Sequence, residues 1–318
     1  MLGFVEHRGM RAVRGLAIAV ACVAAAAVYA QTPLTLYVSA TDASGKPVTD
    51  LKAEEITMTE NGNAGKVTAA EKFSLPVKLT IGIDNGPDSG RALSIFRTGL
   101  TDLVNALPPD VEVTIITMAP QPRTVVKSTA NREELLKGVT RFAPEEQSAR
   151  FTDTLVEYSK ALDKDSKEKK LNYSPFLMIV STTAAEASSY QLPDIEKAMK
   201  NFVLLGGRLF VAMTTTKVAD ANAADDLNNG RQALIAIPLV KETRGKYEAL
   251  AQMNRVQTLL PEWGKLIAAL HVKQTNQFKL SITRPPGATG ALNNLDMRFN
   301  RPGPPLNGSV SGDGRYLQ

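Results

Sequence analysis

An apolar run that leads directly into an aspartate is the part of this sequence best suited to binding chemistry. Residues 77–83 are largely aliphatic, Asp84 follows them, and Asp88 and Ser89 come a few positions later. Ligands of α/β sheets bind where loops leave the carboxyl ends of strands. Carboxylate and hydroxyl oxygens are the donors that Mg²⁺ and Ca²⁺ prefer. The pattern therefore indicates a loop that could hold a divalent cation.

Two interpretations of Asp84 follow from the residues alone. In the first, Asp84 holds a cation directly or through water, helped by Asp88, Ser89 and a hydroxyl from Thr152 or Thr154. In the second, Asp84 caps the turn that follows by accepting hydrogen bonds from backbone N–H groups. A Gly-Pro pair at 86–87 fits a tight turn in either case. Spacing alone favours the capping role.

The composition excludes several classes of function. The chain has 318 residues, a formal charge of +5, one cysteine and two histidines. The positive charge is spread along the chain and aromatic residues are few, so no nucleic-acid-binding surface is expected. Without its first 30 residues the chain keeps His271 and no cysteine. Disulfides, Cys–His catalysis and multi-histidine zinc sites are then excluded.

The N-terminus has the pattern of a cleaved signal peptide. Basic residues precede an apolar run at 16–28, and small-residue cleavage chemistry ends at Ala30. The run is shorter than the roughly 20 residues that a membrane span requires, although an uncleaved anchor is the alternative. We expect residues 1–30 to be removed and the protein to be secreted or periplasmic, without a transmembrane anchor. Either Met1 or Met10 could be the initiator.

Three regions follow the signal peptide. Residues 31–72 alternate apolar and polar positions and contain an Asn-Gly pair, which predicts a small β unit with a hairpin. Residues 73–270 alternate apolar strands with amphipathic helices, which predicts an α/β domain with a doubly wound, mostly parallel sheet flanked by helices. Residues 271–318 are expected to add a C-terminal strand extension, with a strand near 295–299 and a flexible tail.

Local signals predict where some elements begin and end. Asn131 has the side chain of a helix N-cap, and residues 123–128 should form an antiparallel edge strand. Thr154 and Glu157 fit a capping box for a helix that ends near Leu162. Three further segments are assigned from composition: a charged turn at 163–170, a polar loop at 217–229, and a mainly helical region at 247–270 that Pro261 breaks or restarts.

These motifs, in this order, resemble those of the von Willebrand factor type A domain, in the variant of secreted bacterial proteins called the VWFA-related acidobacterial domain. The resemblance spans roughly residues 33–300. It is carried by a strand and Gly-Lys-Pro-Val turn within 36–51, an acidic turn and hairpin within 54–62, and the strand that ends at Asp84. The resemblance implies a vWA-like, Rossmann-like fold that binds protein partners.

The family's metal-ion-dependent adhesion site begins with an Asp-x-Ser-x-Ser loop. This sequence keeps the first residue as Asp84, but Gly86 and Asp88 stand at the two serine positions, and Ser89 lies one place late. The loss of both serines removes two hydroxyl ligands from a site that needs near-octahedral geometry.

The remaining ligands of the family's site are a distant threonine and a later aspartate. The threonine position falls at Thr152 or Thr154, and the aspartate is absent, with Thr183 its expected replacement. The resemblance therefore implies a degenerate site that needs no cofactor, or at most binds Mg²⁺ or Ca²⁺ weakly.

We expect an exported protein–protein binding module that is not an enzyme. Its contact surface would be formed by the loops after Asp84, near Thr152 and Thr154, and around Thr183. Three alternatives remain: a cation-dependent adhesion domain, a structural subunit of an envelope assembly, and a carboxylate-based hydrolase. The hydrolase is disfavoured because its only candidate acids, Asp84 and Asp88, are too close in sequence to flank a substrate. The partner and the oligomeric state are left open.

Overall fold

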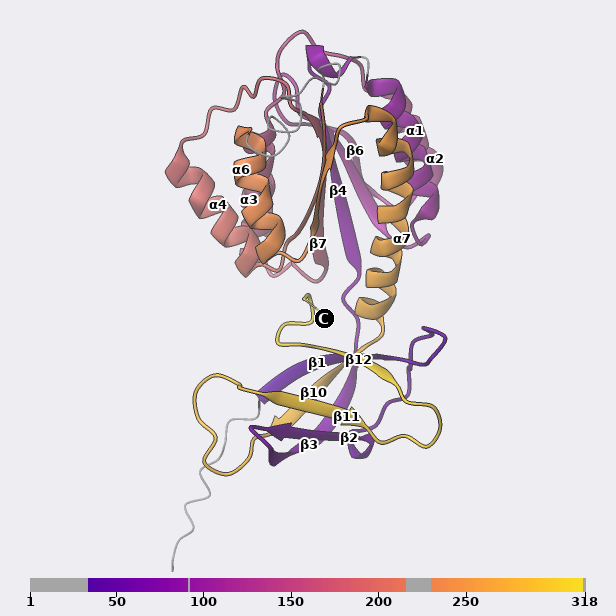
Figure 1. Cartoon of the computed structure of the whole chain (residues 1–318), viewed down its shortest axis with the longest axis vertical. Coiled ribbons are helices and arrows are strands. Elements are labelled where there is room, and N and C mark those ends of the chain that lie inside the picture. The colour runs from indigo at the N-terminus through magenta and orange to yellow at the C-terminus, as the bar shows by residue number, and fades with distance from the viewer. Residues whose placement is uncertain (1–33, 91, 216–229, 317–318) are drawn as a thin grey trace, which may run out of the picture. The chain divides into compact units, whose positions relative to one another are not determined.

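The computed structural model describes residues 34–90, 92–215 and 230–316, except for the side chain of Asp88. The predicted signal peptide at 1–30 and the predicted polar loop at 217–229 lie outside the described residues. Within the described ranges the chain forms two six-stranded sheets, one mostly parallel and flanked by helices, the other antiparallel (Figure 1). The predicted α/β architecture is confirmed.

The mostly parallel sheet has the strand order β6–β5–β4–β7–β8–β9. All neighbouring pairs are parallel except β5 and β6, which run antiparallel, as predicted for the edge strand. The strands are β4 (Val77–Ile83), β5 (Glu112–Thr117), β6 (Arg123–Thr129), β7 (Ser174–Thr182), β8 (Arg208–Thr214) and β9 (Lys246–Leu250). This order is that of a doubly wound fold, in which the chain reverses direction across the sheet beside β4.

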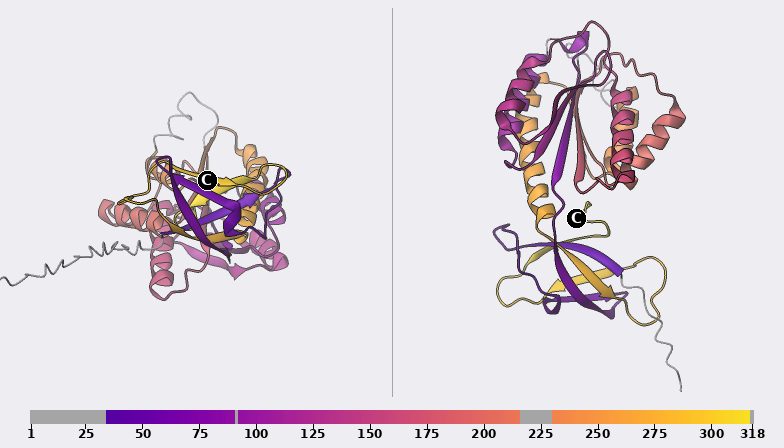
Figure 2. Two further views of the ribbon diagram at one scale, coloured as in Figure 1. Left: turned by 90° about the horizontal axis from the view of Figure 1, so that it is seen from below. Right: turned by 180° about the vertical axis from the view of Figure 1, so that it is seen from behind.

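Helices cover both faces of this sheet (Figures 1 and 2). One face carries α1 (Leu93–Ala106), α2 (Arg132–Arg141) and α7 (Val256–Thr275), and the other carries α3 (Phe151–Lys167), α4 (Leu192–Leu204) and α6 (Arg231–Glu242). Every residue of β7 is buried, as expected for a central strand packed on both sides. Asn131 caps α2 by accepting a hydrogen bond from Glu134 N, as predicted.

The antiparallel sheet joins strands from both ends of the described chain. Its order is β11–β2–β3–β10–β1–β12. The strands are β1 (Leu34–Thr41), β2 (Ile56–Glu60), β3 (Asn63–Phe73), β10 (Gln277–Thr283), β11 (Leu295–Phe299) and β12 (Asn307–Ser311). The predicted hairpin turn lies between β2 and β3, where Asn61 and Gly62 have φ values of 52° and 79°.

The expectation of a flexible tail beyond residue 299 is wrong. Residues 307–311 form β12, which pairs with β1. After it, the Asp313 carboxylate accepts hydrogen bonds from Arg315 N and Tyr316 N, and the Tyr316 hydroxyl lies 2.7 Å from the carbonyl oxygen of Gly207. The polar composition hid these contacts because β12 is short and relies on long-range pairing.

Three local predictions in the α/β region are also wrong. Thr154 does not cap a helix, because α3 already begins at Phe151 and the Thr154 hydroxyl donates to Arg150 O at 2.8 Å. The supposed charged turn at 163–170 is largely the end of α3, where Lys167 and Asp163 form an i,i+4 pair. Residues 246–250 form β9 rather than a helix, and α7 runs without a break through Pro261.

Trp263 and His271 are both buried. Trp263 on α7 is 4% exposed and lies in the apolar core that the parallel sheet shares with α1 and α7. His271 is also buried: its Nδ1 accepts a hydrogen bond from Val77 N at 3.2 Å, and its Nε2 lies 3.0 Å from Asp110 Oδ2. Among the helices described, none combines the length and apolarity needed to cross a lipid bilayer.

Candidate functional site

Asp84 lies at the carboxyl end of β4, where the sequence placed it, and only 2% of it is exposed. Its Oδ1 accepts from Gly86 N at 3.0 Å and from Ser89 Oγ at 3.0 Å. Its Oδ2 accepts from Ser181 Oγ at 3.2 Å, and from the backbone and side chain of Thr182 at 3.0 and 2.7 Å. Five groups of the protein therefore satisfy both oxygens of this carboxylate.

The local sequence explains why Asp84 turns into the protein. Its N–H donates to Val180 O at 2.9 Å and extends the pairing of β4 with β7 by one residue. A short 3₁₀ turn at Pro87–Ser89 then brings the Ser89 hydroxyl back toward the carboxylate. Asp84 thus closes its own turn, which agrees with the capping interpretation.

Asn85 and Gly86 attach this loop to the neighbouring segments. Asn85 Oδ1 accepts from Ala119 N at 3.0 Å, and its Nδ2 donates to Ala143 O at 2.9 Å. A Cβ added at Gly86 would lie 3.1 Å from Ala149 N, which is a tight contact with backbone. The loop is therefore packed under the chain at 143–149, and a serine side chain at position 86 would be crowded.

Of the three threonines predicted for the site, one makes a side-chain hydrogen bond and two make none within the described residues. The Thr154 hydroxyl bonds back to the helix at Arg150 O. The hydroxyls of Thr152 and Thr183 are buried and have no hydrogen-bond partner among the described residues. Thr182, rather than Thr183, contacts Asp84. Of the predicted set, Asp84 and Ser89 are in direct contact, and the structure does not describe the side chain of Asp88.

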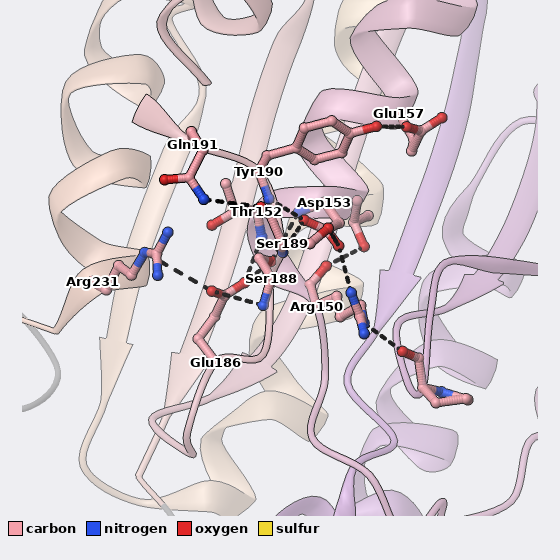
Figure 3. A network of polar contacts seen from close by, with 12 residues as sticks. Arg150, Thr152, Asp153, Glu157, Glu186, Ser188, Ser189, Tyr190, Gln191 and Arg231 are labelled. Carbon is pink, nitrogen blue, oxygen red and sulfur yellow. Dashed lines mark hydrogen bonds and ion pairs between the residues drawn. The ribbon is translucent and has the colours of Figure 1, made fainter. Parts of the chain in front are cut away.

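A polar network that the sequence did not reveal joins the loop after β7 to the start of α3 (Figure 3). Glu186 Oε1 accepts from Thr152 N at 2.9 Å, and Ser188 Oγ accepts from Asp153 N at 3.0 Å. These contacts satisfy N–H groups in the first turn of α3, which have no partner within the helix. Glu186 and Ser188 thus cap the helix from a distant loop.

Asp153 completes this network in the opposite direction. Its Oδ1 accepts from Ser189 N at 2.9 Å and from Tyr190 N at 3.3 Å, and its Oδ2 lies 3.1 Å from Arg150 Nη1. Burial raises the pKa of the Asp153 carboxyl, but the hydrogen bonds from Arg150, Ser189 and Tyr190 outweigh burial and hold the pKa below its usual value. Asp153 is therefore ionised at neutral pH and fixes residues 189–190.

One sequence signal could have revealed the network. Glu186 is an acid in the loop after β7, the region where the family's later aspartate is expected. Its carboxylate is engaged at the start of α3 and, at 4.0 Å, with Arg231 Nε. The carboxylates of Asp84 and Glu186 are thus each used to fasten loops of this edge. Within the described ranges, no three histidine, cysteine, aspartate or glutamate side chains cluster as metal ligands would.

Comparisons with known proteins show similarity at the level of folds. No protein-family profile and no curated protein matches the sequence. Similar solved structures include a von Willebrand factor type A protein from Catenulispora acidiphila, at 10% identity and a TM-score of 0.47, covering 86% of this chain and 71% of that one. Another is the conserved hypothetical protein BatB from Bacteroides thetaiotaomicron, at 13% identity and a TM-score of 0.43, covering 60% and 98%.

A third similar structure is proximal thread matrix protein 1 from the mussel byssus, at 11% identity and a TM-score of 0.43, covering 63% of this chain and 50% of that one. The architecture of this chain is established by its own strand order and antiparallel edge strand, without reference to these similar structures. That architecture is a doubly wound α/β sheet flanked by helices, and the similar solved structures include a von Willebrand factor type A protein.

Proposed function

We propose that this chain is an exported, non-enzymatic protein-binding module that docks its partner at the carboxyl edge of the parallel sheet without a metal ion. The observation that carries the metal-free part is the state of Asp84. Both of its oxygens accept hydrogen bonds from the protein. A cation could use this carboxylate only after several of those bonds were broken.

The energetic comparison disfavours a cation at Asp84. Each hydrogen bond to a charged group contributes about 1.5–3 kcal/mol, and a buried donor left without an acceptor adds a desolvation cost. Mg²⁺ requires near-octahedral geometry, yet Gly86 offers no hydroxyl and Asp84 faces inward. A bound cation would therefore have to reorganise the loop before it gained any ligand.

The edge of the sheet supports a docking role because its loops are already ordered by side chains. Asp153 and Glu186 hold the loop after β7 against α3, and Asn85 holds the loop after β4. Pre-ordered loops reduce the entropy lost on association. The surface is completed by exposed residues such as Pro144, Glu146 and Gln147. We name these loops, at 84–90, 143–150 and 183–191, the docking rim.

A photo-crosslinking experiment tests this proposal. A photoreactive amino acid at Gln147 should link the exported protein to a defined partner in its native envelope, whereas the same residue at exposed Lys170, outside the docking rim, should not. The link should persist in EDTA, because no cation takes part. A link at Gln147 that disappears in EDTA and returns with Mg²⁺ would contradict the metal-free part. Equal links at both positions would contradict the rim.

One observation favours a second candidate function, a weak divalent-cation-dependent binding domain. The hydroxyls of Thr152 and Thr183 are buried and lack partners among the described residues, and such hydroxyls are oxygen donors for hard cations. Titration calorimetry with Mg²⁺, Mn²⁺ and Ca²⁺ separates the candidates. Submillimolar binding that Thr152→Val removes would establish the second function, and heat changes indistinguishable from dilution would support the first.

A further inference from the structure

The antiparallel sheet has two strands with an unpaired edge. β11 lies at one end of the strand order and pairs with β2, and β12 lies at the other end and pairs with β1. The two strands follow one another in sequence, joined by residues 300–306, yet they do not pair with each other. Each therefore presents backbone N–H and C=O groups that no strand among the described residues satisfies.

Residues of both edge strands line one groove of about 880 Å³. In its lining the ring of Phe299 lies against Gly308: a Cβ at Gly308 would lie 2.2 Å from the ring. Both strands line the groove, together with Leu292 from the preceding loop. Its apolar lining includes Leu292, Leu295, Met297, Phe299, Leu306 and Val310, which are only partly buried by the core of this sheet.

The lining of the groove carries a net positive charge, from Arg244 and Arg298 against Asp313. Arg244 is exposed and takes part in no ion pair among the described residues, although its Nη1 donates to Tyr316 O at 3.0 Å. Arg298 pairs with Asp296 at 2.9 Å. The third charged residue of the lining, Asp313, is already held by Ser311 Oγ and by two backbone N–H groups. Arg244 also lies over the ring of Tyr316, and because it has no carboxylate partner among the described residues, it complements an acidic group on an occupant.

These features together select one kind of occupant. An acyl chain would cover the apolar side chains, but it would leave the edge N–H and C=O groups without partners, which is costly. An extended peptide satisfies these groups by adding a strand and places alternate side chains on the apolar lining. We propose that the groove between β11 and β12 binds an extended segment of a protein partner, with apolar residues at alternate positions and an acidic residue at the end near Arg244.

The length of the site sets the length of the segment. β11 and β12 contain five residues each, and a strand rises about 3.3 Å per residue. A segment of about five to seven residues would therefore fill the groove. The site is separate from the docking rim, because the rim loops lie in residues 84–191 and contribute nothing to the lining.

A peptide selection on the whole chain tests the proposal. A phage-displayed library of random nine-residue peptides would be depleted on the Met297→Lys variant and then selected on the native chain. We expect the recovered peptides to share alternating apolar residues and an aspartate or glutamate at one end. Hydrogen exchange with the best peptide bound should show new protection of backbone amides in β11 and β12.

Matched variants separate the groove from general changes in charge. Met297→Lys and Leu292→Lys, both in the groove, should each weaken binding at least tenfold by fluorescence anisotropy. Thr68→Lys, at an exposed position of β3 outside the lining, adds the same charge and should change affinity less than twofold. Arg244→Ala should reduce the preference for the acidic peptide over its amide analogue about fivefold. Melting by circular dichroism identifies any variant that fails to fold, and Leu292→Lys is the less disruptive because it lies outside the strands.

Several results would overturn the proposal. The proposal is wrong if no selected peptide binds the native chain more tightly than it binds the Met297→Lys variant. Binding that both lysine variants left unchanged would place the peptide elsewhere. Unaltered exchange in β11 and β12 would exclude strand addition. Displacement of the peptide by laurate at micromolar concentration, with laurate binding lost in Met297→Lys, would show that an acyl chain is the natural class of occupant.

Discussion

The docking rim and the groove between β11 and β12 differ in how their polar groups are satisfied. At the rim, Asp84, Asp153 and Glu186 are each held by hydrogen bonds from the protein itself. At the groove, two strand edges lie beside apolar side chains with no strand to pair with among the described residues. The carboxylates of the first region are satisfied without a ligand, and its unsatisfied groups are the buried hydroxyls of Thr152 and Thr183, whereas the second region has two strand edges with bonds left to form.

This difference teaches that a carboxylate at the end of a strand does not by itself identify a binding site. A saturated carboxylate stabilises the fold, and a partner then recognises only the surface that it shapes. The unpaired edges of β11 and β12, by contrast, offer a row of backbone groups with which an added strand can pair. The predictions below test each side of this contrast.

The largest effect is expected when Asp84 is removed. Asp84→Ala would leave Gly86 N and both donors of Thr182 without their acceptor, whereas the hydroxyls of Ser89 and Ser181 each keep a backbone carbonyl within reach. The substitution should lower the free energy of unfolding by about 3–5 kcal/mol. Asp84→Asn keeps the shape and should cost less. Urea unfolding followed by circular dichroism measures both. If Asp84→Ala were as stable as the native chain, the Asp84 carboxylate would not stabilise the fold, and a role in binding a ligand would be favoured instead.

The next effect concerns the attachment of the loop after β7. Asp153→Ala removes the acceptor for Ser189 N and Tyr190 N and should cost about 2–3 kcal/mol. Limited proteolysis should then cleave within residues 184–191, which the native chain protects. Asp163→Ala on the same helix is the control, because its carboxylate pairs only with the exposed Lys167 and its loss should leave the cleavage pattern unchanged.

Much of the architecture could be predicted because it depends on short-range patterns. The apolar strand that ends at Asp84, the cap at Asn131 and the Asn61-Gly62 turn each act within a few residues, and each is found where the sequence placed it. The mistaken helix at 247–250 has a physical reason too. β9 is an edge strand of five residues with exposed lysine and glutamate, so it lacks the apolar run of a buried strand.

The polar network could not be predicted, since its partners are far apart in the sequence. Glu186 reaches Thr152 N, and Asp153 reaches Ser189, across more than 30 residues. Which of Thr182 and Thr183 faces Asp84 depends on the register of β7, and a shift by one residue reverses the direction of every side chain. Likewise, only the three-dimensional structure shows that β1 and β12 are neighbours.

A smaller effect is expected from acid on the antiparallel sheet. Hydrogen bonds from Arg301, and then from Lys52 N, lower the pKa of Glu55 to about 2. Because the folded pKa is depressed, the ionised form stabilises the protein above the unfolded pKa of about 4.3, and this contribution is lost as pH falls from there toward 2. After solvent screening it is about 1 kcal/mol. Arg301→Gln should flatten the dependence of the unfolding free energy on pH across this window, and an unchanged slope would contradict the assignment.

The smallest effect on stability is expected from Gly86→Ser, which restores the residue type of the family's metal loop. The new Cβ would lie 3.1 Å from Ala149 N, but serine also reduces the freedom of the unfolded chain, so the net change should stay below about 1 kcal/mol. The variant sharpens the contrast because it adds a hydroxyl while Asp84 remains saturated. Calorimetry should still detect no Mg²⁺ binding. Submillimolar binding in Gly86→Ser alone would show that one missing hydroxyl, rather than the saturation of Asp84, keeps the rim free of metal.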